Sequence, residues 1–352
     1  MPDSYDYSQP VKRAPMRLGS IPFLTMTLIT FCAVFTAAYW AAPHNDTVTP
    51  LSNLVSAILP TPFQIWDHHY LGLFTSFFVH LDIMHLVFNM MWLWKLGSTL
   101  EVTIPPWQYV LFILAATIVA SCSELILSGQ TGAGASGTVY ALMGLLWGGG
   151  GFHASWRQMA NRDNMRLFLV WCVLCIFLTV SHIMNIGNGA HFGGLLFGLA
   201  VGYLFYAPRR KLVWIPVLVL MVGVCIVSLT WMPWSSLWNW HEGGKAFQNH
   251  QYAKAAASYE RALRTGDEQQ GPRIGIALSQ YSLAVEAFDN NRLEAAKAAD
   301  ARFEEAMKTA IAAEPHGSDS GDTSAPSAEA QLTPMKTYLD AVLKIKQSQK
   351  GQ

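Results

Sequence analysis

Apolar stretches follow one another along the chain up to residue 232. Each is close to the roughly 20 residues that a helix needs to cross the hydrocarbon core of a bilayer. The fourth and the sixth stretch are rich in glycine and are the least hydrophobic. We predict membrane spans at 21–42, 83–99, 106–126, 136–152, 166–186, 189–207 and 212–232.

Beyond residue 240 the pattern changes to amphipathic helices and polar segments. Over 241–312, small and large residues recur at the spacing of helix–turn–helix tetratricopeptide-like repeats: Gly243, Ala246, Tyr252, Ala255, Tyr259 and Ala262. Residues 313–352 are predicted to form a flexible linker, rich in Ser, Gly, Asp, Ala and Pro, and a short terminal helix at 335–348. The fold class is therefore all-α, with a polytopic membrane helix bundle followed by a small α-helical soluble domain.

Composition narrows the class of protein further. Only 13% of the residues are charged, whereas an ordinary soluble domain carries about 25%. The 52% hydrophobic content excludes intrinsic disorder. The 23 basic and 23 acidic residues cancel, so no global field attracts nucleic acid and we expect no nucleic-acid partner.

The basic residues indicate an orientation. They lie before the first stretch, between the fourth and fifth, and between the sixth and seventh: Lys12, Arg13 and Arg17, then Arg157, Arg162 and Arg166, then Arg209, Arg210 and Lys211. Segment 43–83 has no Lys or Arg. By the positive-inside rule, we expect the tail 1–20 to be cytoplasmic and the C-terminal domain to be extracytoplasmic. We expect the membrane to be the bacterial plasma membrane. The first stretch is longer than a signal-peptide core of about 7–15 residues, which favours a retained anchor.

Three polar clusters open the second, fourth and sixth spans. Polar groups inside a bilayer are costly and point to function. In the predicted topology all three clusters lie at the outer ends of their spans, so they share a depth and can converge on one site. In chain order they contain His80, His85 and Asn89, then Gly134, Ser136, Gly137 and Tyr140, then His191 and Gly194.

Each cluster also has a structural interpretation. A single Ser in a glycine-rich span usually serves helix packing, and Gly194, Gly198 and Gly202 recur every four residues, which lets two helix backbones approach closely. Taken singly, the clusters favour packing. Jointly they supply a nucleophile, a base and further hydrogen-bond donors at one depth, which favours catalysis.

The chemistry of such a site is coherent. A Ser136 hydroxyl needs an adjacent base, and His191 can accept its proton. We expect no Asp or Glu near the clusters at this depth except Asp82, which lies in a loop. The histidine base would then not be oriented by a carboxylate, so a Ser–His dyad is predicted rather than a triad. Tyr140, one turn after the serine, can stack on the His191 ring. The Asn89 amide, the His85 ring and the Ser136 backbone N–H are the predicted donors to an oxyanion.

These motifs resemble the rhomboid family of intramembrane serine proteases. The resemblance rests on His80-x4-His85-x3-Asn89, Gly134-x-Ser136-Gly137 with Tyr140, Ala190-His191-x2-Gly194-x3-Gly198, and Glu101 after Trp92-Leu-Trp-Lys-Leu-Gly97. It covers about residues 21–207, a six-helix catalytic core, with 208–234 as an added seventh span. One departure is the first outer loop, where many members carry a Trp-Arg pair and this chain has Leu71 and Gly72.

The resemblance implies hydrolysis of peptide bonds in or beside membrane spans of other proteins, within the lipid bilayer. Ser136 would be the nucleophile, His191 the general base, and His85 and Asn89 part of the oxyanion hole. His80, Gly134, Gly137, Tyr140 and Gly194 would support them. No metal, cofactor or ATP is implied.

Two other functions remain open. A catalytically silent rhomboid-like protein would bind transmembrane helices without cutting them. A transporter would use the histidines as a proton relay, although no carboxylate in mid-membrane and no internal repeat is evident. The outer domain would in addition recruit a protein partner or substrate.

Overall fold

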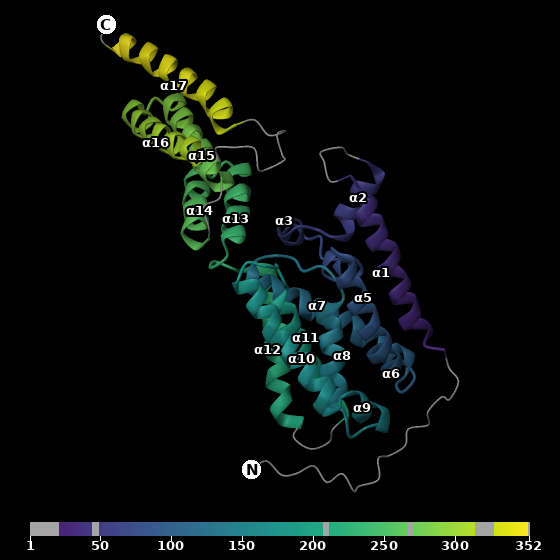
Figure 1. The fold of residues 1–352 in the computed structure, drawn as a ribbon. Coiled ribbons are helices and arrows are strands. Elements are labelled where there is room, and N and C mark those ends of the chain that lie inside the picture. Colours follow the sequence, from purple (N-terminus) through teal and green to yellow (C-terminus); the bar gives the residue numbers. More distant parts are fainter. Residues whose placement is uncertain (1–20, 44–48, 207–210, 267–269, 314–326, 351–352) are drawn as a thin grey trace. The chain divides into compact units, whose positions relative to one another are not determined.

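The computed structural model describes residues 21–43, 49–206, 211–266, 270–313 and 327–350. The regular elements in these ranges are helices, which confirms the predicted fold class (Figure 1). The chain divides into two compact units, Met1–Trp231 and Met232–Gln352. The predicted tail 1–20, the basic residues Arg209 and Arg210, and most of the predicted linker lie outside the described residues.

The first unit runs from α1 to α12. Its elements are α1 (Phe23–Ala41), α2 (Pro50–Ile58), α3 (Pro62–Trp66), α4 (Gly72–Thr75), η1 (Ser76–Phe78), α5 (Ile83–Trp92), η2 (Leu93–Gly97), α6 (Ser98–Glu101), α7 (Pro106–Ser128), α8 (Ser136–Gly148), α9 (Ala154–Met159), α10 (Arg162–Val180), α11 (Asn188–Val201), η3 (Gly202–Tyr206) and α12 (Lys211–Thr230).

Most of the predicted spans correspond to long apolar helices. Within the described ranges, five helices are long and apolar enough to cross a membrane: Phe23–Ala41, Pro106–Ser128, Arg162–Val180, Asn188–Tyr206 and Val213–Thr230. A sixth candidate combines Gly72–Phe78 with Ile83–Glu101, which are bent by 99° at the break between them. The bend lies at the first polar cluster, so His80 falls in the break and His85 in the first turn of α5.

The helix at the fourth predicted span is shorter than expected. α8 has 13 residues, or about 20 Å at 1.5 Å per residue, against a hydrocarbon core of about 30 Å. It ends in the glycine run that begins at Gly148, and nearly all of its residues are buried by neighbouring helices. α8 is therefore shorter than the span predicted at 136–152. A helix of this length can still lie within the bundle, because other helices rather than lipid surround it.

Glycines bring α8 and α11 into direct backbone contact. A Cβ atom at Gly194 or at Gly198 would overlap the carbonyl oxygen of Gly137 or of Ala141, respectively. One at Gly202 would lie 2.6 Å from the carbonyl oxygen of Leu145. The four-residue glycine spacing thus lets the two helices pack closely, as small residues do in membrane bundles.

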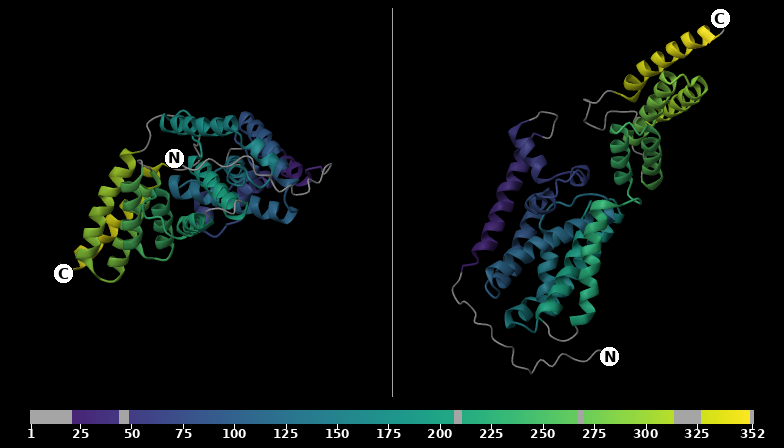
Figure 2. Two further views of the ribbon diagram at one scale, coloured as in Figure 1. Left: turned by 90° about the horizontal axis from the view of Figure 1, so that it is seen from below. Right: turned by 180° about the vertical axis from the view of Figure 1, so that it is seen from behind.

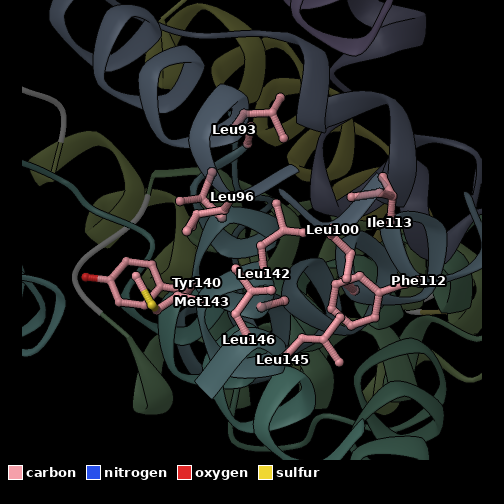
Figure 3. Close-up of a cluster of buried hydrophobic side chains, with 14 of the residues drawn as sticks. Leu93, Leu96, Leu100, Phe112, Ile113, Tyr140, Leu142, Met143, Leu145 and Leu146 are labelled. Atoms are coloured by element: carbon pink, nitrogen blue, oxygen red, sulfur yellow. The ribbon is translucent and has the colours of Figure 1, made fainter. Parts of the chain in front are cut away.

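Large aliphatic side chains fill the space between α8 and the segment Ile83–Glu101. Figure 3 shows the labelled side chains of these elements and of α7 gathered in one cluster. Leu93, Leu96, Leu100 and Leu142 are completely buried. This cluster holds α8 in the centre of the first unit.

The outer helices carry apolar side chains on their exposed faces. On α10, Val170, Val173 and Phe177 are each at least 60% exposed. A soluble protein rarely exposes such a continuous apolar surface, whereas a lipid environment accommodates it.

The second unit consists of consecutive packed helices, α13 (Ser236–Gln248), α14 (Tyr252–Thr265), α15 (Gln270–Asp289), α16 (Leu293–Ala312) and α17 (Ala328–Lys350). Each of α13 to α16 contacts the next, and Figure 2 shows them as neighbours in both further views. The Tyr259 ring lies against two backbones: a Cβ at Gly243 would be 2.6 Å from it, and one at Gly275 2.7 Å. This packing of small residues against a large ring agrees with the predicted spacing. No finding tests the tetratricopeptide-like repeat itself, which stays a prediction.

The terminal helix differs from the expectation. α17 begins at Ala328 and has 23 residues, whereas a short helix at 335–348 was predicted. Leu332 and Leu339 are completely buried in the cluster formed with α15 and α16. Lys336, between them, places its Nζ atom 3.0 Å from an Asp300 carboxylate oxygen. Tertiary contacts thus extend a helix that local composition assigns to a linker.

We expect Gly198→Ala to destabilise the protein. Because the new Cβ meets backbone rather than a flexible side chain, α8 and α11 must separate, at a cost of about 1–3 kcal/mol. Gly223→Ala on α12 is the matched control, since no atom beyond the adjacent backbone of its own helix lies within 4 Å of its Cβ position among the described residues. That variant should be neutral or stabilising by up to about 1 kcal/mol. Thermal unfolding in detergent compares the two, and equal midpoints would contradict the packing argument.

Candidate active site

Ser136 and His191 meet at the N-terminal ends of two adjacent helices. Ser136 is the first residue of α8, and His191 lies in the first turn of α11. The His191 Nε2 atom is 2.9 Å from the Ser136 Oγ atom. The ring is 3% exposed, while the serine is only partly buried. This is the distance at which a general base can take the proton of a nucleophilic hydroxyl.

Two features of the His191 environment bear on the predicted dyad. The Tyr140 ring stacks on the imidazole, with centroids 4.5 Å apart and planes 20° apart. The Tyr140 hydroxyl donates to the carbonyl oxygen of Phe168 at 3.1 Å, which ties this ring to α10. His191 Nδ1 is buried and has no hydrogen-bond partner among the described residues. The structure therefore shows a Ser–His pair without a carboxylate on the far side of the imidazole.

His80 supports the loop that leads into α8. Its Nε2 atom accepts the Ala135 backbone N–H at 3.2 Å, and its side chain is completely buried. An accepting ring nitrogen carries no proton, so this tautomer has its proton on Nδ1. Nδ1 lies 3.4 Å from the Thr36 hydroxyl of α1. Thr36 is a contact that the motif spacing did not reveal.

Gly134 sits directly against the two histidines of the first cluster. It has a φ of +98°, which favours glycine. A Cβ there would lie 2.7 Å from the His85 ring and 3.2 Å from the His80 ring. Asp82, predicted in a loop, is the N-cap of α5 and accepts the His85 backbone N–H at 2.8 Å. The first and second clusters are therefore in contact.

Asn89 has an unusual environment. Its side chain is 6% exposed, and its Nδ2 atom has no hydrogen-bond partner among the described residues. A buried amide donor left unpaired costs about 1–3 kcal/mol and calls for an explanation. The N–H groups in the first turn of α8, including that of Ser136, also lack intrahelical partners. Donors that the sequence assigned to an oxyanion are thus available on α5 and α8.

Gly137 and Gly194 permit the close contact of α8 and α11, which carry Ser136 and His191. A Cβ at Gly137 would lie 2.7 Å from Ala120 Cβ on α7 and 3.1 Å from Ala190 on α11. Larger side chains at either glycine would separate the helices that carry Ser136 and His191.

Glu124 corrects the expectation that Asp82 is the acidic residue near the clusters. Glu124 lies in α7, is 6% exposed, and its Oε2 atom accepts the backbone N–H of Ala190 at 3.1 Å. A carboxylate inside the predicted span 106–126 was the feature that would have identified it. It also removes the argument that the membrane region has no carboxylate, which was used against a transporter.

The loop that precedes α5 is anchored without the Trp-Arg pair. A Cβ at Gly72 would overlap the Pro60 ring, so no larger side chain fits there without a backbone shift. Trp66 is 3% exposed, and its indole N–H donates to the Ser228 carbonyl oxygen of α12 at 3.0 Å. The Ser121 hydroxyl of α7 donates to the Leu73 carbonyl oxygen at 2.8 Å. The loop is therefore anchored to α7 and to the seventh predicted span.

Comparison with known proteins places these residues in context. Residues 63–208 match the Rhomboid domain family. The chain is 30% identical over 149 residues to the Rhomboid protease GlpG of Salmonella paratyphi A (strain ATCC 9150 / SARB42), and equally to that of Salmonella choleraesuis (strain SC-B67). Each match covers 42% of this chain and 51% of the relative, so the chain spans about half the length of the curated relatives it matches.

The matched segment contains Ser136, His191, His85 and Asn89, and it ends before α12 and the second unit. Together with the candidate spans, it identifies a multi-pass integral membrane protein. Residues 63–208 of the chain are therefore similar to the Rhomboid domain.

Proposed function

We propose that this protein is an intramembrane serine endopeptidase that cleaves transmembrane segments of other membrane proteins. The 2.9 Å contact between His191 Nε2 and Ser136 Oγ carries the proposal. The match of residues 63–208 to the rhomboid domain and the 30% identity to rhomboid proteases support it.

The proposed reaction uses the dyad twice. Ser136 Oγ attacks the scissile carbonyl carbon while its proton passes to His191 Nε2. The tetrahedral intermediate collapses to an ester on Ser136, the C–N bond breaks, and His191 returns the proton to the leaving amine. A water molecule then attacks the ester with His191 as base, which releases the acid and restores the serine.

The negative charge of the intermediate needs donors that are in place beforehand. Asn89 Nδ2, the Ser136 backbone N–H and the His85 ring are the proposed donors. The unpaired Nδ2 atom supports this role, because a buried donor without a partner is available to a developing oxyanion. The Tyr140 ring keeps the imidazole in plane for both proton transfers.

The silent binder and the transporter remain as alternatives. A binder has no use for a serine hydroxyl 2.9 Å from a histidine nitrogen, so this contact favours the protease. The buried Glu124 carboxylate is the feature that a transporter would use. These functions differ in their response to Ser136→Ala.

We also propose that the N-terminus is cytoplasmic and that the second unit lies outside, in a bacterial plasma membrane. The distribution of Lys and Arg between the spans supports the orientation, and the bacterial source of the similar proteins supports the membrane. The second unit, in this proposal, is a tetratricopeptide-like module that binds a protein partner. The packing of Tyr259 against Gly243 and Gly275 supports such a module.

Ser136→Ala and His191→Ala should abolish cleavage equally, because members of a dyad act as a unit. Asn89→Ala should retain some activity, with a loss on the order of 10²–10³, since the other donors remain. The three variants are ranked by their initial cleavage rates on one reconstituted single-span substrate and by their labelling with a fluorophosphonate probe. Normal cleavage by folded Ser136→Ala would exclude the protease. A transporter would tolerate that change but lose transport with His191→Ala.

A reporter fused after Gln352 should be active outside the cytoplasm. Counting α8 as a crossing, the chain traverses the membrane an odd number of times from a cytoplasmic N-terminus. The same reporter fused before residue 21 is the control and should report the cytoplasm. Cytoplasmic activity of the C-terminal fusion would refute the proposed orientation.

Ending the chain before Ser235 should leave fluorophosphonate labelling of Ser136 unchanged and slow the cleavage of substrates that bind the second unit. Quantitative mass spectrometry of membrane fragments compares cells with the full and the shortened chain. Identical fragment yields for every substrate would contradict a recruiting role.

A further inference from the structure

The Glu124 carboxylate has no part in the proposed dyad, yet it is one of the most buried charged groups near it. A carboxylate in a membrane-spanning helix is costly unless hydrogen bonds compensate for lost water. Its Oε2 atom accepts the backbone N–H of Ala190 at 3.1 Å. Ala190 directly precedes His191, so the compensating contact lies beside the proposed base.

The first turn of α11 rests on Glu124. No side chain of α11 itself caps this helix, so its first N–H groups need outside acceptors. A negative charge at a helix N-terminus is also favourable. Gly189 makes the contact close: a Cβ there would be 2.5 Å from the Ser123 carbonyl oxygen and 3.0 Å from Glu124 Oε2. The backbone before His191 is therefore docked on α7 by both packing and a hydrogen bond.

The His191 ring has few other polar restraints. Its Nε2 atom faces the serine, and its Nδ1 atom has no partner in the described part of the chain. The stacked Tyr140 ring restrains the orientation of the imidazole plane, but stacking does not fix the position of the imidazole along the α11 axis. The position of the imidazole relative to Ser136 thus depends on where the backbone of the first α11 turn is held.

We propose that Glu124 is a positioning residue for His191: its carboxylate caps α11 from the neighbouring helix and so sets the distance from Nε2 to the Ser136 hydroxyl. This inference rests on the proposed protease function. Glu124 acts through the helix backbone, and an amide oxygen at the same place can accept the same N–H.

The test compares Glu124→Gln, which keeps an acceptor, with Glu124→Leu, which removes it. The readouts are the rate of Ser136 labelling by a fluorophosphonate probe, and kcat and KM on a single-span substrate. Glu124→Gln should stay within about threefold of the wild type. Glu124→Leu should lower labelling and kcat by about 10- to 100-fold with little change in KM, because a misplacement of about 1 Å costs roughly that much.

A matched control separates positioning from loss of stability. Tyr206→Phe removes the 3.1 Å hydrogen bond between the Tyr206 hydroxyl and Gln108 Oε1, which joins α7 to η3, the continuation of α11. It should lower the unfolding midpoint while labelling stays normal. If it slows labelling as much as Glu124→Leu at the same midpoint, the positioning role is refuted. If Glu124→Leu cannot be purified, Glu124→Asp, whose side chain is one methylene shorter, should label more slowly than Glu124→Gln.

The outcomes distinguish the two proposals. Wild-type protein that is not labelled, or Ser136→Ala that is labelled as strongly, would refute the protease function. Selective wild-type labelling together with normal labelling of Glu124→Leu would refute only the role of Glu124. Labelling of Glu124→Gln as slow as that of Glu124→Leu would also refute the role of Glu124, because the hydrogen-bond acceptor at this position would then not be what positions His191.

Discussion

The close backbone contact between α8 and α11 is the constraint on which the site depends. α8 carries Ser136 and α11 carries His191, so their 2.9 Å contact requires the two helices to stay together. Glycines at the facing positions permit this, because a carbonyl oxygen of one helix occupies the space that a Cβ of the other would need. Apolar surface alone does not enforce such contact in a bilayer, because lipid tails are as apolar as leucine.

Polar side chains inside the bundle secure the ends of helices that belong to other segments. Glu101 accepts the backbone N–H groups of Leu24 and Thr25 at the start of α1, each at 2.8 Å. Glu124 does the same for α11, and His80 for the residue before α8. An unpaired backbone group costs several kcal/mol in lipid, so these contacts hold the bundle together as well as shaping the site.

The sequence was informative about the site because polar residues are rare in membrane spans. The polar clusters, read with the predicted topology, were enough to expect Ser136 and His191 at one depth, and the structure brings them together. Glu124 was visible in the sequence as a carboxylate inside a predicted span, but its contact with α11 was not, because its partner, Ala190, is 66 residues away in the chain and on another span. The length of α8 was overestimated because an apolar pattern does not distinguish a helix buried by protein from one exposed to lipid.

The sequence by itself determined the helical class, the position of most long helices and the residue types of the dyad, since these follow from local hydropathy and side-chain chemistry. Only the tertiary structure decided that Trp66 anchors the loop before α5 to α12, that α17 begins at Ala328 and that Glu124 contacts α11. Each of these depends on contacts between segments distant in the chain, and local patterns of hydrophobic and polar residues carry no information about such pairings.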